Sequence, residues 1–218
     1  MKLSINLFRT FDGVSQGPGS AHEDPRAGFT NGGWLMPVFD EGVGEAVNGW
    51  FERCGALLLG RRTYDTFASH WPRVTDPGDP VAATINDAHK YVVTSTDLTT
   101  TAWAEDTTVL GADFVDEIKH LKSSDSPDEL QVHGSVQLAH SLHEAGLVDV
   151  YRFVVAPVVV GDGSGIFTDT SPAATMTVTH SAVTPGGCFV VEMEPGTFVN
   201  DLTAAVEDGH DVIRDANA

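Results

Sequence analysis

The sequence predicts one α/β domain, and two junctions between an apolar strand and a helix are the main observations behind this prediction. The apolar run 57–59 ends at Gly60, and a helical pattern follows at once. The short strand 129–132 likewise reaches Gly134 and Ser135 before a helix begins. A chain of 218 residues with 41% hydrophobic composition can bury one substantial core, so we expect a single large domain.

The other elements follow from the spacing of apolar residues. Leu3, Ile5 and Leu7 alternate with polar residues and indicate a first strand. The stretch 12–34 has no periodicity, and a loop of that length in a compact domain commonly covers a site. Helices are then expected at 40–53, 62–70, 82–87, 114–121 and from the second glycine junction to 145, and strands at 56–59, 90–95, 108–110, 129–132, 148–155, 174–183 and 187–193.

The last two of these strands are expected to form a C-terminal β-hairpin, which completes a domain of residues 1–198. Residues 199–218 are largely polar and are expected to form a loosely held tail. The N-terminal residues are too short and too polar for a signal peptide, and no apolar run reaches transmembrane length. We therefore expect a cytoplasmic protein.

The charge balance excludes several classes of partner. The chain has 31 acidic and 12 basic residues, a formal charge of −19, and such a surface repels nucleic acid and anionic membranes. We therefore expect neither as a partner. Only Cys54 and Cys188 are present, each in an apolar context, so buried free thiols are expected in place of a disulfide framework.

The two glycine junctions predict a nucleotide-phosphate site. Glycine lets the backbone approach a ligand closely, and the free N–H groups at a helix start favour a bound phosphate. Arg61 and Arg62 follow Gly60 directly, in a chain where basic residues are scarce. Taken alone, the first junction could equally be a strand–helix connection whose arginines are only solvated. The second junction, at Gly134, favours the phosphate site. Neither junction has the G-x-G-x-x-G or Walker pattern.

Six segments in order carry a resemblance to a known family: Asp12-Gly13-Val14, Leu59-Gly60-Arg61-Arg62-Thr63-Tyr64, Tyr91-Val92-Val93-Thr94-Ser95, Val132-His133-Gly134-Ser135, Ala145-Gly146-Leu147-Val148-Asp149 and Pro157-Val158-Val159-Val160-Gly161-Asp162-Gly163. Together they resemble the dihydrofolate-reductase superfamily, and within it the C-terminal reductase domain of the riboflavin-biosynthesis deaminase-reductase. The resemblance covers roughly residues 1–195. It implies a three-layer α/β/α fold around a mixed, mostly parallel sheet. It also implies NADPH at the carboxyl ends of the strands, hydride transfer to a small-molecule substrate and, in many members, a homodimer.

The resemblance also implies roles for individual residues in cofactor binding. The 2′-phosphate and pyrophosphate would be held by Gly60, Arg61, Arg62 and Thr63, the adenosine side would lie along Thr94 and Ser95, and the pyrophosphate would be wrapped from the opposite side by Gly134, Ser135, Val136, Gln137 and Leu138. An arginine pair fits NADP better than NAD, because the doubly charged 2′-phosphate needs cationic donors.

Candidates for the catalytic side lie on the long loop and at the start of the first helix. Hydride transfer to a polarised C=N or C=O needs a nearby proton source and a dry pocket. Asp12, Trp34, Asp40 and Glu41 flank the expected mouth of the site. In dihydrofolate reductase an acidic residue on this helix contacts the pteridine, so Asp40 or Glu41 is the leading candidate. The alternative for both is a helix cap, and for Trp34 a loop anchor.

Two departures from the family pattern bear on the function. Val136 stands where relatives commonly have glycine, and 164–166 stand where many carry a basic pair, which disfavours the phosphorylated riboflavin intermediate as substrate. We expect an NADPH-dependent reductase of a small heterocyclic or carbonyl/imine compound. The alternative is a non-catalytic NADP(H)-binding or sensor protein that retains the fold. A metal site at His133, His140 and His143 has no supporting motif, so no metal is expected.

Overall fold

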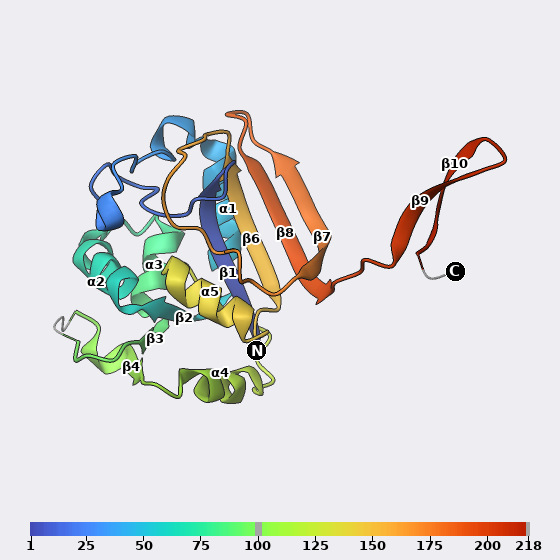
Figure 1. Ribbon diagram of the computed structural model, residues 1–218. Helices are drawn as coiled ribbons and strands as arrows, with labels where there is room; N and C mark the ends of the chain where they lie inside the picture. Colours follow the sequence, from blue (N-terminus) through green and yellow to red (C-terminus); the bar gives the residue numbers. More distant parts are fainter. Residues whose placement is uncertain (99–101, 217–218) are drawn as a thin grey trace.

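The computed structural model describes residues 1–98 and 102–216, and its main feature is an eight-stranded sheet with helices on both faces (Figure 1). The strands are β1 (Lys2–Thr10), β2 (Cys54–Gly60), β3 (His89–Val93), β4 (Thr107–Leu110), β5 (Glu129–Val132), β6 (Val150–Ala156), β7 (Ala174–Val183) and β8 (Phe189–Thr197). The helices are α1 (Glu41–Phe51), α2 (Arg61–His70), α3 (Pro80–Asp87), α4 (Phe114–Lys122) and α5 (Val136–Glu144), with short 3₁₀ turns η1 (Arg26–Gly28), η2 (Met36–Val38), η3 (Trp71–Arg73) and η4 (Ala104–Asp106).

The sheet is mixed and mostly parallel, as expected. Its strand order is β4-β3-β2-β5-β1-β6-β8-β7. Strands β1 to β6 run parallel to one another, while β8 pairs antiparallel with both β6 and β7. Because β3, β2 and β5 are adjacent and parallel, their carboxyl ends meet at one edge of the sheet, which is where open α/β sheets bind ligands.

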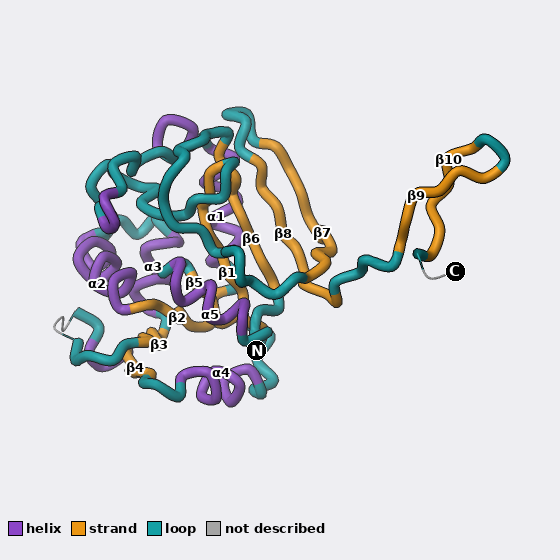
Figure 2. The backbone as a smooth tube through the Cα atoms, viewed as in Figure 1, coloured by secondary structure: helices purple, strands orange, loops and turns teal. Residues whose placement is uncertain are grey.

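Two helical layers cover the parallel part of the sheet (Figure 2). On one face, α4 and α5 bury Ile118, Leu138 and Leu142 against strand residues such as Leu58 and Leu130. On the other face, α1, α2 and α3 supply the buried apolar residues Val43, Trp50, Phe51, Tyr64, Val81 and Ile85. The three-layer α/β/α prediction is therefore confirmed. No helix of the described chain is long and apolar enough to cross a membrane.

The expected elements all form, and the differences lie at their ends. Strand β3 stops at Val93, so Thr94 and Ser95 belong to the loop beyond it. Helix α1 begins at Glu41, because Asp40 caps it in an extended conformation. The expected C-terminal hairpin is the β7–β8 pair, which forms the edge of the main sheet.

The segment after residue 198 differs from the expected loose tail. It contains a second, two-stranded sheet of β9 (Leu202–Glu207) and β10 (His210–Asp215), which leads away from the main sheet in Figure 1. Asp208 and Gly209 both have positive φ, 50° and 81°, the conformation that a two-residue hairpin turn requires. The Asp-Gly pair was thus a turn signal that the polar composition obscured. Residues 217 and 218 of the expected tail lie outside the described residues.

A polar network is buried beneath α1, between β5, β1, β6 and β8. Arg152 donates to both Glu129 oxygens, at 2.6 and 2.7 Å, and also to Glu192. The Ser4 hydroxyl donates to Glu129 at 2.9 Å. Burial would raise the pKa of Glu129, but Arg152 and Ser4 outweigh it and hold the pKa below its ordinary value. Removing one member of such a buried ion pair costs about 3–5 kcal/mol. Because the members come from β1, β5, β6 and β8, the network links these four strands.

His133 lies at the end of this network, just before the second glycine junction. Its ring stacks on Phe51 at a centroid distance of 4.3 Å. Gln131 Nε2 donates to the Trp50 carbonyl, so Gln131 Oε1 is left to accept from His133 Nε2 at 2.9 Å. Burial, followed by the charge of Arg152, lowers the pKa of His133 to about 3. The imidazole is therefore neutral in the folded protein at neutral pH.

We predict that protonation of His133 destabilises the protein in mild acid. A folded-state pKa below the unfolded value gives stability that is present above about pH 6.5 and is lost as the pH falls. Between about pH 7 and pH 5 the free energy of unfolding should fall by up to about 1.4 kcal/mol per pH unit on this account. His133→Gln, which retains an N–H donor, should reduce the slope in urea denaturation. His22→Gln, at an exposed position, should not. Equal slopes in all three proteins would contradict the assignment.

Candidate functional site

The two glycine junctions contact each other directly. The Gly60 N–H donates to the Gly134 carbonyl at 3.4 Å. A Cβ at Gly60 would lie 2.5 Å from Ser135 Oγ, and a Cβ at Gly134, whose φ is +133°, would lie 2.8 Å from Thr63 Oγ1. Only glycine fits at either position without displacing the opposite junction. The contact places the first turns of α2 and α5 side by side at the carboxyl ends of β2 and β5.

The first turn of α2 lacks the side-chain cap and the acidic residues that usually stabilise a helix start. Its N-cap is Gly60, and no side chain caps the free N–H groups of the turn. Arg61 and Arg62 occupy the first two helical positions, where a cation opposes the positive end of the helix dipole by about 0.3–1 kcal/mol each. In α5, Ser135 Oγ accepts from the Leu138 N–H at 3.3 Å, and neither first turn contains an acidic residue. This arrangement favours a bound anion.

A cleft of about 470 Å³ opens in front of the two first turns. Eight of the eleven expected cofactor residues line it, namely Gly60, Arg61, Arg62, Thr94, Ser95, Ser135, Gln137 and Leu138. The other three, Thr63, Gly134 and Val136, belong to the same two junctions. The structure thus brings the three predicted cofactor segments together around one opening.

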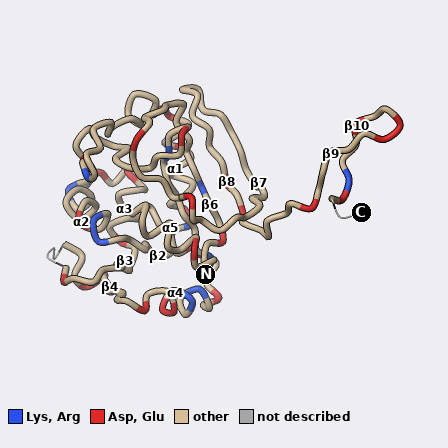
Figure 3. The backbone as a smooth tube through the Cα atoms, in the orientation of Figure 1, with Lys and Arg blue, Asp and Glu red and all other residues tan. Residues whose placement is uncertain are grey.

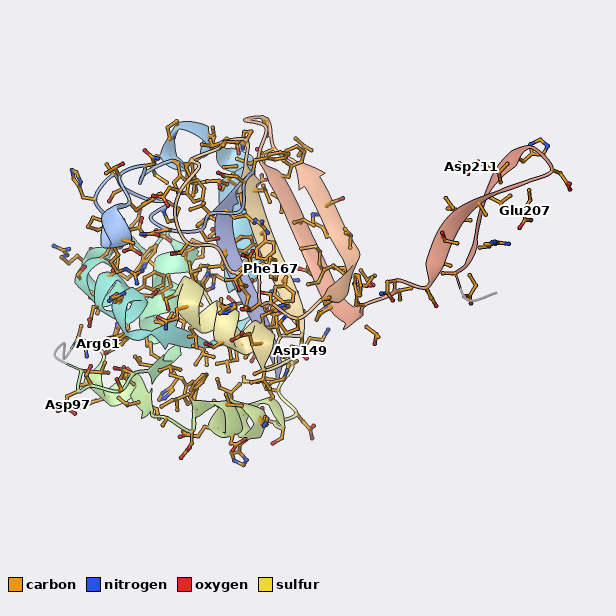
Figure 4. All side chains as sticks on the ribbon, viewed as in Figure 1. Arg61, Asp97, Asp149, Phe167, Glu207 and Asp211 are labelled. Atoms are coloured by element: carbon orange, nitrogen blue, oxygen red, sulfur yellow. The ribbon has the colours of Figure 1, made fainter. Side chains whose placement is uncertain are left out.

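Arg61 shapes the wall of this cleft. Its Nε donates to Asp65 at 2.8 Å, one turn along α2. Its Nη1 donates to Thr96 Oγ1 at 3.0 Å and to the Asp97 carbonyl at 2.6 Å, and Figure 4 shows Arg61 beside Asp97. Because these bonds tie α2 to the loop after β3, they position Thr94 and Ser95 along the same opening.

Arg62 and Arg26 supply the other two cations of the cleft. Arg62 is exposed; among the described residues it makes no hydrogen bond or ion pair, and its charge acts only at longer range on Asp24. Arg26, in η1 of the long loop, donates from Nε to Asp24 at 2.5 Å. The Arg26 hydrogen bond is the main cause that lowers the pKa of Asp24, and the charge of Arg62 contributes. Three of the few basic residues therefore meet here, and Figure 3 shows basic positions around α2.

Sequence reasoning missed Arg26. The residue lies in a stretch without periodicity, so nothing in its local pattern predicts its position. Two general signals could have found it: basic residues are rare in this chain, and the long loop was expected to cover a site.

The acidic catalytic candidates hold backbone in place. Asp40 accepts from the Val43 N–H at 2.9 Å and from the Gly186 N–H at 2.5 Å, and the Val43 bond is the main cause that lowers the Asp40 pKa. Asp12 accepts from the Thr10 hydroxyl, which is the main cause that lowers the Asp12 pKa, and from the Gly161 N–H at 2.7 Å. Both carboxylates are therefore held in the charged form.

The other two catalytic candidates occupy different settings. Glu41 is the first residue of α1 and is exposed. Trp34 is buried, and its Nε1 donates to the Gln16 carbonyl at 2.8 Å, so it anchors the long loop. None of the four candidates lines the arginine cleft. A catalytic role for Asp12, Trp34, Asp40 or Glu41 stays a prediction.

Most of the chain matches a known protein family. The model of the family described as the RibD C-terminal domain matches residues 1–190. The chain belongs to the RibD C-terminal domain family. This family comprises reductase domains with the dihydrofolate-reductase-like fold, as the sequence resemblance implied.

Relatives of this RibD C-terminal domain differ widely in sequence. The uncharacterized protein YyaP of Bacillus subtilis (strain 168) is 23% identical over 174 residues, which cover 77% of this chain and 81% of YyaP. A putative riboflavin biosynthesis protein from Shewanella sp. PV-4 has a TM-score of 0.65 at 18% identity, over 89% of this chain and 99% of that one. A pyrimidine reductase-like protein from Corynebacterium diphtheriae has a TM-score of 0.59 at 10% identity, over 89% of this chain and 91% of that one. At these identities the structures show a shared fold.

The matched region also includes two histidines that fasten a loop of the RibD C-terminal domain. His140 Nδ1 lies 3.0 Å from the Ile166 carbonyl. His143 Nε2 lies 3.2 Å from the Pro172 carbonyl, while its Nδ1 lies 2.8 Å from the Tyr151 hydroxyl. These contacts hold the segment between β6 and β7 against α5. Among the described residues, no group of three or more His, Cys, Asp or Glu is arranged to bind a metal.

We predict that Gly60→Ala separates the two junctions. The added Cβ would meet Ser135 Oγ at 2.5 Å, and overpacking of this kind costs about 1–3 kcal/mol. Urea denaturation should show this loss. Gly49→Ala is the matched control, because a Cβ there meets nothing within 4 Å and alanine favours the helix. Stability equal to wild type in Gly60→Ala would mean that the junctions are not packed as described.

Proposed function

We propose that the protein is an NADPH-dependent reductase that transfers a hydride to a small heterocyclic or carbonyl/imine substrate. One observation carries the proposal: three arginines and two adjacent helix N-termini converge on a cleft in a protein of formal charge −19. Membership of a reductase-domain family supports the reaction class. The bound cofactor would supply the hydride, and the protein would supply binding, orientation and a dry pocket.

The donors around the cleft fit a phosphorylated dinucleotide. The first turns of α2 and α5 offer backbone N–H groups to a pyrophosphate, and the close glycine contact keeps the two turns adjacent. Arg62 is the arginine best placed for a 2′-phosphate, since no described residue occupies its guanidinium. Arg26 faces the same opening from the loop. A forked guanidinium binds a doubly charged phosphate in two hydrogen bonds, which favours NADPH over NADH.

The substrate end of the site would lie toward β1, beyond the arginine cleft. Asp12 lies two residues after the end of β1 and accepts from the Val160 and Gly161 N–H groups, so it fixes the loop after β6 beside the end of β1. Asp40 fixes the start of α1 against Gly186. In this proposal these residues shape the substrate pocket, and Asp40 or Glu41 orients the polarised substrate.

A second candidate function is a non-catalytic NADP(H)-binding or sensor protein. The observation in its favour is that Asp12 and Asp40 are both engaged by backbone N–H groups and have lowered pKa values. A carboxylate with a low pKa is a poor proton donor at neutral pH. The two candidates agree on cofactor binding and differ in whether any substrate is turned over.

We predict that Arg62→Ala weakens NADPH more than NADH. Losing a hydrogen-bonded charge pair costs about 1.5–3 kcal/mol, roughly a 10- to 100-fold loss in affinity, and NADH lacks the 2′-phosphate that would make the pair. Fluorescence titration with both nucleotides measures the effect. Arg73→Ala is the matched control, because Arg73 is exposed and lies outside the cleft. An equal loss for both nucleotides would remove the 2′-phosphate role.

We predict that Asp40→Asn lowers turnover and leaves NADPH affinity nearly unchanged. Asparagine caps a helix about as well as aspartate, so α1 should keep its start while the charge is lost. The rate is measured as NADPH oxidation with a substrate found by screening heterocyclic imines and carbonyl compounds. An unchanged rate would leave Asp40 as a helix cap only. NADPH binding without turnover of any compound would favour the non-catalytic candidate.

A further inference from the structure

The β9–β10 hairpin, residues 202–215, is a projecting arm with one apolar face. Directly paired residues of antiparallel strands point to the same side, and the pairs are Leu202 with Asp215, Ala204 with Ile213 and Val206 with Asp211. Leu202, Val206 and Ile213 on this side are 62%, 74% and 77% exposed. A two-stranded hairpin is at best marginally stable alone in water, so this face needs a partner surface.

The arm is additional to the family domain. The family match ends at residue 190, and the short connector 198–201 carries the arm away from the sheet in Figure 1. Figure 4 shows Glu207 and Asp211 at its far end, remote from Phe167 on the body of the protein. The connector itself exposes Phe198 and Val199 by 51% and 57%. In this arrangement the apolar face of the arm does not pack on its own domain.

A complementary apolar surface lies on the main sheet. Arg9, Val155, Phe189 and Val183 form one row across β1, β6, β8 and β7, because each is paired with the next. In the same way, Met193 is paired with Val178 on the same side of the sheet. Phe189, Val178 and Val183 are 45%, 56% and 64% exposed. No helix of the described chain lies over this side of β7 and β8 in Figure 2; Met193 packs partly against the core there, while Phe189, Val178 and Val183 stay exposed.

Arg9 gives this sheet surface a single positive charge. Its guanidinium lies 5.3 Å from the Phe153 ring centroid and 5.9 Å from that of Phe167. Within the part of the chain that the structure describes, Arg9 makes no hydrogen bond or ion pair. Burial lowers the Arg9 pKa, although arginine stays charged at any physiological pH. A half-buried cation without an anion is costly, so the surface favours a partner that carries a carboxylate among apolar side chains.

We propose that the arm of one copy docks on this sheet surface of a second copy, with Asp211 meeting Arg9. Asp211 lies on the apolar face of the arm and is unpaired among the described residues. A second copy meets both needs of the surface at once, since its arm supplies apolar contacts and, at Asp211, a carboxylate. A two-fold axis makes every contact twice, and stable dimers bury about 1,600 Å² in total.

Charge reversal in the full-length chain tests the contact. Arg9→Asp and Asp211→Arg each place like charges at both copies of the contact, and each should weaken the dimer about tenfold or more. Mixing the two variants should restore it, because each arm then meets a charge of opposite sign. Sedimentation velocity over a wide range of protein concentration measures the assembly state. Glu207→Arg, on the opposite face of the arm, and Arg73→Asp, remote from the sheet surface, are the matched controls and should stay dimeric.

Each possible outcome decides the proposal. A dimeric wild type, two weakened variants and a dimeric mixture would support it. A wild type that is monomeric at every concentration would overturn it, and so would dimers unaffected by either reversal. A mixture that stays monomeric would also overturn it, since an arm that docks on its own domain would produce this result. Ile213→Asp, which removes an apolar contact of the arm, should weaken the dimer with the fold intact by circular dichroism. NADPH titration reports on the proposed reductase function separately.

Discussion

The close contact between the two glycine junctions is the constraint on which the site depends. With Gly60 against Ser135 and Gly134 against Thr63, α2 and α5 must start at the same edge of the sheet. Two positive dipole ends and three arginines then share one opening, and among the described residues Asp24 and Asp65 form ion pairs with Arg26 and Arg61. Such an arrangement is electrostatically unfavourable while it stands alone and becomes favourable when an anion occupies it. The arrangement therefore favours an anionic ligand at the expense of stability without one, which supports the proposed cofactor site.

The buried polar network keeps this edge of the sheet in register. Arg152 reaches Glu129 on β5 and Glu192 on β8, and Gln131 connects the same strand to α1 through the Trp50 carbonyl. Each group in the network has its hydrogen-bond partners only when β1, β5, β6 and β8 keep their observed pairing. A shift of one residue would leave a buried charge unpaired, at a cost well above that of a displaced apolar residue. His133 links this network to the second glycine junction.

The sequence predicted the features that depend on interactions among a few neighbouring residues. Both glycine junctions, the helices that follow them and the eight strands could be read from the sequence, because burial and glycine geometry act over a few residues. Arg26 could not, since its position depends on how a loop without periodicity packs. The β9–β10 hairpin was missed because the charged residues between its apolar positions outweighed the turn signal of Asp208 and Gly209. Asp40 was ambiguous for a different reason: a helix cap and a catalytic acid call for the same residue type.

Because the protein is strongly acidic, the positions of its few basic residues matter for binding an anion. A chain of formal charge −19 repels a nucleotide at long range, so general electrostatic attraction could not hold the proposed cofactor. Affinity must come from groups within hydrogen-bond reach, where screening by salt and by distance matters less. The same reasoning applies to the sheet surface, where Arg9 is a lone cation among apolar side chains. In both proposals a few arginines in an acidic protein would bind a phosphate or carboxylate by short-range contact, which favours specificity over rapid capture.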